Sequence, residues 1–444
     1  MVRKLLRNYG MIVILILLCA LFSVLTLKKR APSGDLAVSE MADRIRAEFP
    51  ESQIIFSVGA VNTDSGSFAE KLGEVLKKQG YEKCHVVIGT PRELRGELDQ
   101  VLSVGQTVSA LVTTGEAAEW HVMDSIAELY PDFSNCRVLA PEPRMWPDFL
   151  KKSNLLAIVD RIVVIAVMAI GMTMVIITGG IDLSVGSLTA LSAVIGTGLM
   201  KQMGGLQASA GVVFVGFLVG VLSCAAIGGI GGFLVARFKV APFITTLGIM
   251  MMARGLAFLI TGGFSIYQVP ATLPWLGQGT SLGIPNTVIL LVLLYLAAHI
   301  FMSHTPMGRY IYAVGGNREA ARLSGVPVSV VLIFVYVLCS AAAGLGGCIQ
   351  ASQLNTGTPN MGLMYELYVI AAVVVGGTSL SGGTGKIFGT LIGAFIISVI
   401  QNGMNLLGIE SYTQQVVLGA VIVVAILLDK LRSSGKIPGT RKSN

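Results

Sequence analysis

Apolar residues occur in long runs along most of the chain, separated by short segments that carry polar and charged residues. The first run covers 9–27, and further runs lie near 154–178, 184–200, 209–236, 241–262, 286–303, 328–350, 364–379, 387–405 and 413–429. Most runs are close to the ~20 residues that a helix needs to cross ~30 Å of hydrocarbon. The pattern predicts an α-helical polytopic membrane protein with about ten transmembrane helices.

The first run is preceded by Arg3, Lys4 and Arg7 and is followed by three basic residues at 28–30. A cleaved signal peptide has an apolar region of about 7–15 residues and then a small-residue cleavage site. Here the run is longer and ends in lysine and arginine. Residues 1–27 are therefore predicted to form an N-terminal transmembrane helix that stays attached.

Residues 28–150 follow another pattern, in which short apolar stretches alternate with amphipathic ones. Strands are predicted at 53–60, 85–89, 108–114 and 136–140, and helices at 68–79, 91–102 and 117–130. This alternation is typical of a parallel α/β sheet, and the segment resembles one lobe of the periplasmic sugar-binding proteins. A docking or spacer domain and a ligand sensor both remain open, while the absence of G-x-G-x-x-G after the first strand argues against dinucleotide binding.

Composition and charge separate the two parts further. The chain has 444 residues, is 53% hydrophobic and only 13% charged, whereas soluble proteins are about 25% charged, so a soluble enzyme is excluded. Residues 28–150 hold 13 basic and 19 acidic residues, and the rest of the chain holds 19 basic and 6 acidic ones. The net charge of +7 therefore reflects basic membrane loops rather than nucleic-acid binding.

The basic residues also predict an orientation. If the N-terminus is cytoplasmic and the spans alternate, nearly all lysines and arginines in the connections after residue 200 lie on the cytoplasmic side, as the positive-inside rule requires. They are Arg237, Lys239, Arg309, Arg318, Arg322, Lys386 and, in and just before the cytoplasmic tail 433–444, Lys430, Arg432, Lys436, Arg441 and Lys442. Residues 28–150 then form an extracytoplasmic α/β domain inserted after the first helix, and residues 151–432 form the membrane body.

The cysteines and histidines show no metal-ligand spacing, so no metal and no cofactor is expected. Cys84 and Cys136 precede the second and fourth predicted strands, which are not neighbours in a doubly wound sheet. We therefore favour free thiols over a disulfide between them.

Three stretches of the membrane body carry candidate chemistry. In Thr178–Leu188 (TGGIDLSVGSL), Asp182 or Ser184 is suited to cap the next helix. The pattern GGxxLSxG of this stretch recurs at Gly376–Gly383. The two copies are explained either by an internal parallel repeat or by coincidence in a glycine-rich chain.

The second stretch is the longest predicted cytoplasmic connection, Gly308–Val326. It contains a capping residue, a short helical segment and a stop signal: Asn317, Arg318, Glu319, Ala320, Ala321, Arg322 and Gly325. An exposed short helix suits the groove of a partner protein, although a solvated loop would have the same composition.

The third stretch places Arg254 inside an apolar span, where a charge is costly and must face the bundle or water. Glu366, within or at the mouth of another span, is its possible partner. A role in the translocation path and a purely structural role are both open for Arg254, Glu366 and Asp182.

Four segments together resemble the membrane permease subunits of ABC sugar importers, in the ribose/xylose/galactose branch. They are VIITGGIDLSVGSLTAL, PFITTLGIMMMARGLAFLITGG, YAVGGNREAARLSGV and the long segment that begins YELYVIAAVVVGGTSLSGG. The resemblance implies a non-enzymatic, multi-pass permease of the bacterial inner membrane. It also implies a second permease copy, identical or related, a periplasmic sugar-binding protein, and a cytoplasmic ATPase that docks on Asn317–Gly325.

Three other functions have sequence features that test them. The segment SGGTGKIFG departs from the Walker pattern at Leu380 and Ile387, so ATP hydrolysis must come from another subunit. An ion-coupled secondary transporter would need carboxylates at membrane depth, and few are available. A membrane-anchored sensor would need only one of the ten spans.

Overall fold

The computed structural model describes residues 2–133 and 135–433 of the chain. The chain divides into two compact units: Leu27–Asp148, which we term the α/β unit, and Met1–Thr26 with Phe149–Asn444, which we term the helical unit. The predicted tail, 433–444, lies outside the described residues from position 434 onward.

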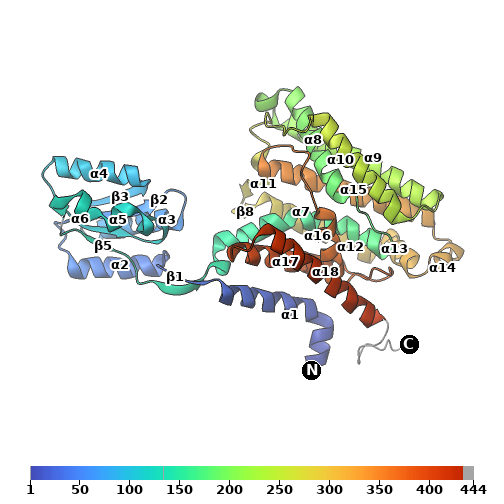
Figure 1. Ribbon diagram of the computed structural model, residues 1–444, viewed down its shortest axis with the longest axis horizontal. Coiled ribbons are helices and arrows are strands. Elements are labelled where there is room, and N and C mark those ends of the chain that lie inside the picture. The colour runs from blue at the N-terminus through green and yellow to red at the C-terminus, as the bar shows by residue number, and fades with distance from the viewer. Residues whose placement is uncertain (1, 134, 434–444) are drawn as a thin grey trace. The chain divides into compact units, whose positions relative to one another are not determined.

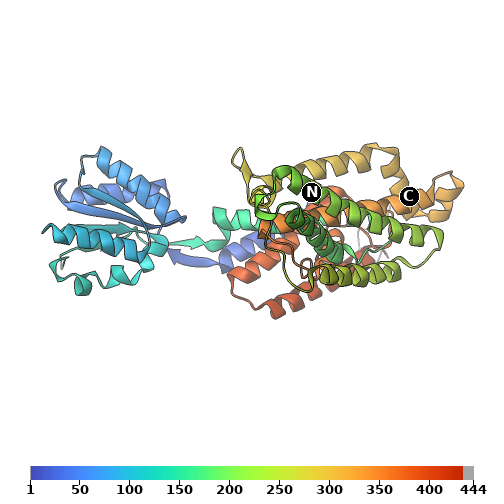
Figure 2. The same ribbon diagram turned by 90° about the horizontal axis from the view of Figure 1, so that it is seen from above.

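The α/β unit is built on a four-stranded parallel sheet. Its strands are β2 (Ile54–Ala60), β3 (Cys84–Gly89), β4 (Val108–Thr113) and β5 (Arg137–Leu139), in the order β3-β2-β4-β5. Alternate residues of the strands face opposite sides: Ile55 packs with α2 (Asp35–Glu48) and α3 (Asp64–Lys78), and Phe56 with α4 (Pro91–Ser103). Helices therefore cover both faces of the sheet (Figure 2).

The prediction of one continuous helix at 117–130 is wrong, because the segment forms three short helices. The structure has a 3₁₀ helix, Gly115–Glu119, followed by two four-residue helices, α5 (His121–Asp124) and α6 (Ile126–Leu129). Trp120 breaks the first junction because its backbone is extended, with φ −70° and ψ 131°. The interrupted chain still buries Val122 and Ile126 against the sheet.

The two cysteines of the α/β unit lie on opposite edge strands. Cys84 begins β3 and Cys136 directly precedes β5, so β2 and β4 separate them, and both are free. Burial raises the pKa of each thiol to about 11. Both thiols are therefore protonated, and poorly nucleophilic, near neutral pH.

A two-stranded antiparallel ribbon closes the α/β unit. It consists of β1 (Leu27–Arg30) and β6 (Arg144–Pro147), with Lys28 opposite Trp146. The first and last segments of the unit are thus paired with each other.

In the described part of the helical unit, helices lie at the positions of the predicted spans (Figure 1). They are α1 (Val2–Leu25), α7 (Lys152–Ile177), α8 (Val185–Gln202), α9 (Ala210–Arg237), α10 (Pro242–Thr261), α12 (Asn286–His304), α15 (Val328–Leu354), α16 (Tyr365–Val375), α17 (Ile387–Leu406) and α18 (Ser411–Ser433). Shorter elements connect them: α11 (Pro274–Gly277), β7 (Thr280–Ser281), β8 (Ile284–Pro285), α13 (Pro306–Gly316) and α14 (Arg318–Leu323).

Six of these helices are long and apolar enough to cross a membrane by length and composition: α7, α9, α10, α12, α15 and α17. The helix α16 has 11 residues, which reach only about 17 Å. The helix predicted over 364–379 is thus longer than the one observed. It ends early because Gly377 turns the chain with φ +86°.

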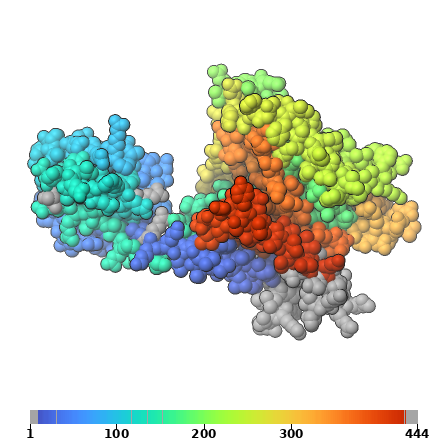
Figure 3. Space-filling view, viewed as in Figure 1, coloured from blue at the N-terminus to red at the C-terminus, as the bar shows by residue number. Residues whose placement is uncertain are grey.

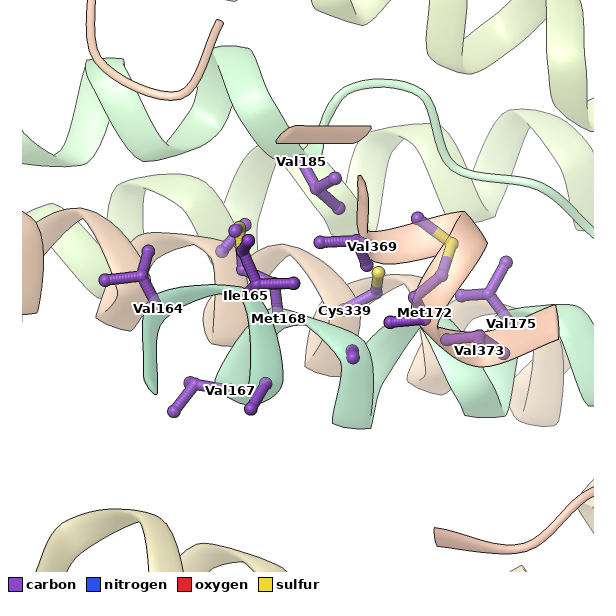
Figure 4. Packing of buried hydrophobic residues seen from close by; sticks show 14 of the residues in the cluster. Val164, Ile165, Val167, Met168, Met172, Val175, Val185, Cys339, Val369 and Val373 are labelled. Atoms are coloured by element: carbon purple, nitrogen blue, oxygen red, sulfur yellow. The ribbon is translucent and has the colours of Figure 1, made fainter. Parts of the chain in front are cut away.

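The core of the helical unit is centred on α7. Its residues Val164, Met168 and Met172 pack among side chains of α8, α15 and α16, including Val185, Cys339 and Val369 (Figure 4). At the crossing with α15, a side chain on Gly171 would overlap the backbone of Cys339. This close approach is typical of membrane helices, which pack through small residues.

Other helices present apolar side chains outward. The helices α9 and α10 form an outer surface of the helical unit (yellow-green and yellow in Figure 3). Phe214 and Ile230 on α9, and Met251 and Leu259 on α10, are exposed there. Such a surface suits contact with lipid tails or with another membrane helix.

Candidate functional site

The segment Asn317–Gly325, which we term the docking segment, folds as its sequence predicts. The Asn317 side-chain oxygen accepts a hydrogen bond from the Ala320 backbone N–H at 3.0 Å and caps α14. Gly325, with φ +81°, donates its N–H to the Arg322 carbonyl and ends the helix. Cap, short helix and stop are thus all present.

The docking segment presents a mixed polar and apolar face to solvent. Glu319 and Arg322 form an i,i+3 ion pair at 3.0 Å, and their side chains remain 75% and 67% exposed. Leu323 is exposed beside them, whereas Ala321 is buried against the body. The exposed face has the charge and the apolar anchor that a partner groove would recognise.

The docking segment is attached to the end of α7. Arg318 donates from Nη2 to the Thr178 carbonyl at 3.3 Å. Gly383 donates its N–H to the Ile177 carbonyl at 2.8 Å. Tyr312 of α13 donates its hydroxyl to the Gly385 carbonyl at 2.9 Å. Three segments far apart in sequence therefore meet, at Ile177–Gly180, Gly315–Gly316 and Gly382–Gly385; we term this meeting point the junction.

The junction leaves no room for a side chain at Gly315. A Cβ there would overlap the Ile177 carbonyl oxygen and approach the Gly383 nitrogen. The neighbouring Gly316 has nothing within 4 Å of the same position. Close backbone contact, rather than unusual dihedral angles, is what requires glycine at Gly315.

Both copies of the glycine pattern lie at the C-terminal end of a helix, but different glycines of the pair take the left-handed position. Gly179 ends α7 with φ +78°, and the Gly180 N–H bonds to the Val175 carbonyl. The equivalent geometry after α16 occurs at Gly377, with the Thr378 N–H bonded to the Val373 carbonyl. These are Schellman motifs. The sequence pairs Gly179 with Gly376, so the two patterns are offset by one residue in the structure.

Asp182 is buried at the start of α8. Its Oδ1 accepts hydrogen bonds from the Ser184 backbone N–H at 2.9 Å and from the Ser184 hydroxyl at 2.6 Å. Ser184 is the N-cap residue, but its own side chain makes no capping bond, because its backbone is already helical. Asp182 thus orders the turn rather than capping α8 directly.

Arg254 and Glu366 lie on either side of one loop. Arg254 of α10 donates from Nη1 to the carbonyls of Pro359 at 2.6 Å and Met361 at 2.7 Å. The carboxylate of Glu366, in the first turn of α16, lies against Gly186 of α8. The guanidinium therefore donates to backbone carbonyls and also interacts with the charge of Glu366. Glu366 itself lies against the start of α8, close in sequence to Asp182.

Replacing Arg254 by methionine should destabilise the subunit. The change leaves the carbonyls of Pro359 and Met361, both buried residues, without their donor. Hydrogen bonds to charged groups contribute about 1.5–3 kcal/mol each, so we expect the melting temperature of the purified subunit to fall by about 5 °C. Arg237→Met, which removes an exposed arginine, is the control. Equal melting temperatures for the two variants would contradict the role of Arg254.

Sequence reasoning missed the residues that build the junction. In the sequence, nothing distinguishes Tyr312 from the other aromatic residues of its connection, or Gly315 from the other glycines among the 53 of the chain. Gly315 contacts Ile177 and Gly383, and Tyr312 bonds to Gly385, and all these partners are more than 60 positions away along the chain. The only local signal was the cluster of glycine pairs near 179, 315, 376 and 382.

Comparisons with known proteins give a consistent result. Residues 154–426 match the family model described as branched-chain amino acid transport system / permease component. The chain is 44% identical over 288 residues to the ribose import permease protein RbsC of Escherichia coli K12, covering 64% of this chain and 87% of that protein.

Two further relatives agree with these matches. The ribose import permease protein RbsC of Bacillus subtilis is 42% identical over 290 residues, covering 65% of this chain and 88% of the relative. The D-allose transport system permease protein AlsC of Escherichia coli K12 is 35% identical over 285 residues, covering 64% and 86%. No solved structure matches the chain.

Proposed function

Because this chain belongs to the family of branched-chain amino acid transport system permease components, we propose that it is the permease subunit of an ATP-binding-cassette importer for a monosaccharide or a similar small polar solute. The observation that carries this proposal is the 44% identity to a ribose import permease over 87% of that relative's length. The chain does no covalent chemistry; it offers a path across the bacterial inner membrane.

The partners follow from this role. A cytoplasmic ATPase binds the docking segment and supplies the energy, and a periplasmic sugar-binding protein delivers the solute. A second permease subunit, identical or related, completes the path. The exposed Glu319–Arg322 pair and Leu323 support the ATPase contact, and attachment of α14 to the end of α7 through Arg318 gives that contact a route into the membrane body.

The proposed topology has ten spans and a cytoplasmic N-terminus. The six long apolar helices are joined by α1, α8, α16 and α18. In this orientation Arg237, Arg309, the docking segment and Lys386 lie in the cytoplasm, as the positive-inside rule favours. The short helix α16 reaches only part of the way across and is completed by the segments on either side of it.

We place the α/β unit, corresponding to the predicted domain 28–150, outside the cytoplasm as an inserted module. Deleting residues 33–147 should therefore leave a membrane-inserted permease body. The chain on either side of the deletion can be rejoined over a short distance, because the Phe149 backbone N–H donates to the Thr26 hydroxyl at 3.1 Å. Detergent-solubilised protein should elute as a monodisperse peak, whereas aggregation would mean that the α/β unit is needed for folding.

The function is tested by transport in proteoliposomes that contain this chain, its ATPase and its binding protein. Uptake of D-ribose, D-allose or L-arabinose with ATP and without an ion gradient is the expected result. Uptake that requires an ion gradient and ignores ATP would instead assign a secondary transporter.

A further inference from the structure

A polar cleft opens on the helical unit. It consists of two adjoining hollows, one with a volume of about 510 Å³ and one of about 270 Å³, and both are lined by Arg161 and Tyr365. The larger hollow adds Asp160, Gln278 and Gln353, from α7, the residue after α11, and α15. With the smaller hollow, which adds residues of α17 and α18, the cleft is formed where six segments of the membrane body meet.

Arg161, with the adjacent Asp160, lies well inside the largely apolar helix α7. It is nine residues beyond Lys152, the first residue of α7, which corresponds to about 14 Å along the helix axis. Its side chain is exposed on this single chain. A guanidinium at that depth is costly against lipid, so it must face water or protein. The open side of the cleft therefore faces an aqueous path or a second subunit.

The smaller hollow is lined mostly by residues that carry a polar group. Of its seven lining residues only Ile165 is aliphatic, and the other six are Arg161, Tyr365, Tyr368, Gln401, Asn405 and Gln414. Such a lining is unusual in a membrane body made of apolar helices, whereas the larger hollow is also lined by the apolar side chains of Ala157 and Val164.

Neighbouring groups hold the polar side chains in place. Gln350 donates its amide to the Tyr365 hydroxyl at 2.8 Å, and Gln414 donates to the Asn405 side-chain oxygen at 2.8 Å. Gln353 donates to the Asp160 carbonyl at 3.0 Å, while the Asp160 carboxylate accepts from the Thr287 hydroxyl at 3.3 Å. Preorganised polar groups lower the ordering cost of binding.

We propose that this polar cleft binds the transported solute and that its ligand class is a neutral, polyhydroxylated ring. Side-chain amides both donate and accept hydrogen bonds, as vicinal hydroxyls do, and tyrosine rings cover the C–H faces of a sugar. Asp160 and Arg161 have opposite charges, so the cleft has no excess charge to favour an ion. This inference rests on the proposed function and identifies the site at which that function selects its substrate.

The test uses the complete transporter, with its ATPase and binding protein, in proteoliposomes. Arg161→Gln and Gln401→Ala should each lower ATP-driven uptake of D-ribose, D-allose or L-arabinose at least tenfold. Gln268→Ala, an exposed residue outside both hollows, should stay within twofold. Normal uptake by both cleft variants would overturn the assignment of the cleft while leaving the proposed function intact.

A second measurement does not depend on transport. In a Gln401→Cys variant, a water-soluble methanethiosulfonate reagent should modify the new thiol, and the sugars should slow this reaction at least fivefold while L-leucine leaves it unchanged. Absence of modification, or protection by L-leucine instead of sugar, would overturn the inference. If the wild-type transporter moved no sugar, the proposed function would fail separately, and sugar protection of the thiol would still support the cleft.

Discussion

Reversing the two charges of the docking helix, with Glu319→Lys and Arg322→Glu together, should abolish most ATP-driven uptake while the subunit still inserts into the membrane. The double change keeps an i,i+3 ion pair within α14, because the partners only exchange positions. The partner surface, however, meets the opposite charge at each position. Like charges brought together at an interface cost several kcal/mol, and about 3 kcal/mol corresponds to about a 100-fold loss.

Co-purification of the ATPase with the variant permease measures this contact directly, beside uptake in proteoliposomes. The matched control reverses another exposed ion pair, Asp35→Lys with Lys71→Asp in the α/β unit, whose nitrogen and oxygen lie 2.6 Å apart. The control should retain uptake within twofold and still bind the ATPase. An unchanged ATPase contact in the docking variant would refute the assigned role of α14.

Introducing alanine at Gly315 should uncouple hydrolysis from transport. The new Cβ overlaps the Ile177 carbonyl oxygen, so the backbone at the junction must shift, which costs about 1–3 kcal/mol or more. That shift should separate the docking segment from the end of α7, which is the route we propose for ATPase motion to reach the membrane body. For about 2 kcal/mol we expect sugar moved per ATP hydrolysed to fall about 30-fold.

Gly316→Ala is the adjacent control, because its Cβ meets nothing within 4 Å. Both positions lie in the last turn of α13, so both substitutions have the same effect on helix propensity. The ratio of uptake to hydrolysis, measured in the same proteoliposomes, should differ between them. If both variants couple normally, the junction is not part of the transmission route.

The membrane helices and the docking segment were predictable from local sequence. An apolar run of about 20 residues has few alternatives to a buried or lipid-facing helix, because its backbone must satisfy its own hydrogen bonds. The docking segment is equally local, since the Asn317 cap and the Gly325 stop act within one turn. The parallel strands of the α/β unit were predicted from patterns within single strands. The prediction that the strands at Cys84 and Cys136 are not neighbours is confirmed, because β3 and β5 lie at opposite edges of the sheet.

Predictions that depended on register or on continuity were less accurate. The run 364–379 is apolar beyond Val375, yet α16 ends there because Gly377 adopts a left-handed backbone. The glycine pattern matched by sequence at Gly179 and Gly376 is offset by one residue in the structure. The expected partner of Arg254 was the carboxylate of Glu366, which does interact with it through its charge. The hydrogen bonds of Arg254, however, go to two loop carbonyls. Every residue has a backbone carbonyl, so the sequence alone does not predict which carbonyls a side chain will bond.

The sequence alone predicted the long apolar helices, the place of the α/β unit in the chain and the short exposed helix α14, because hydrophobic burial, capping and charge bias act over one or two turns. Only the tertiary structure decided that Gly315 meets Ile177 and Gly383, and that Arg161 of α7 shares a polar cleft with Tyr365 and Gln401. Those contacts join helices far apart in the chain, and they are set by how closely whole helices pack rather than by any local preference.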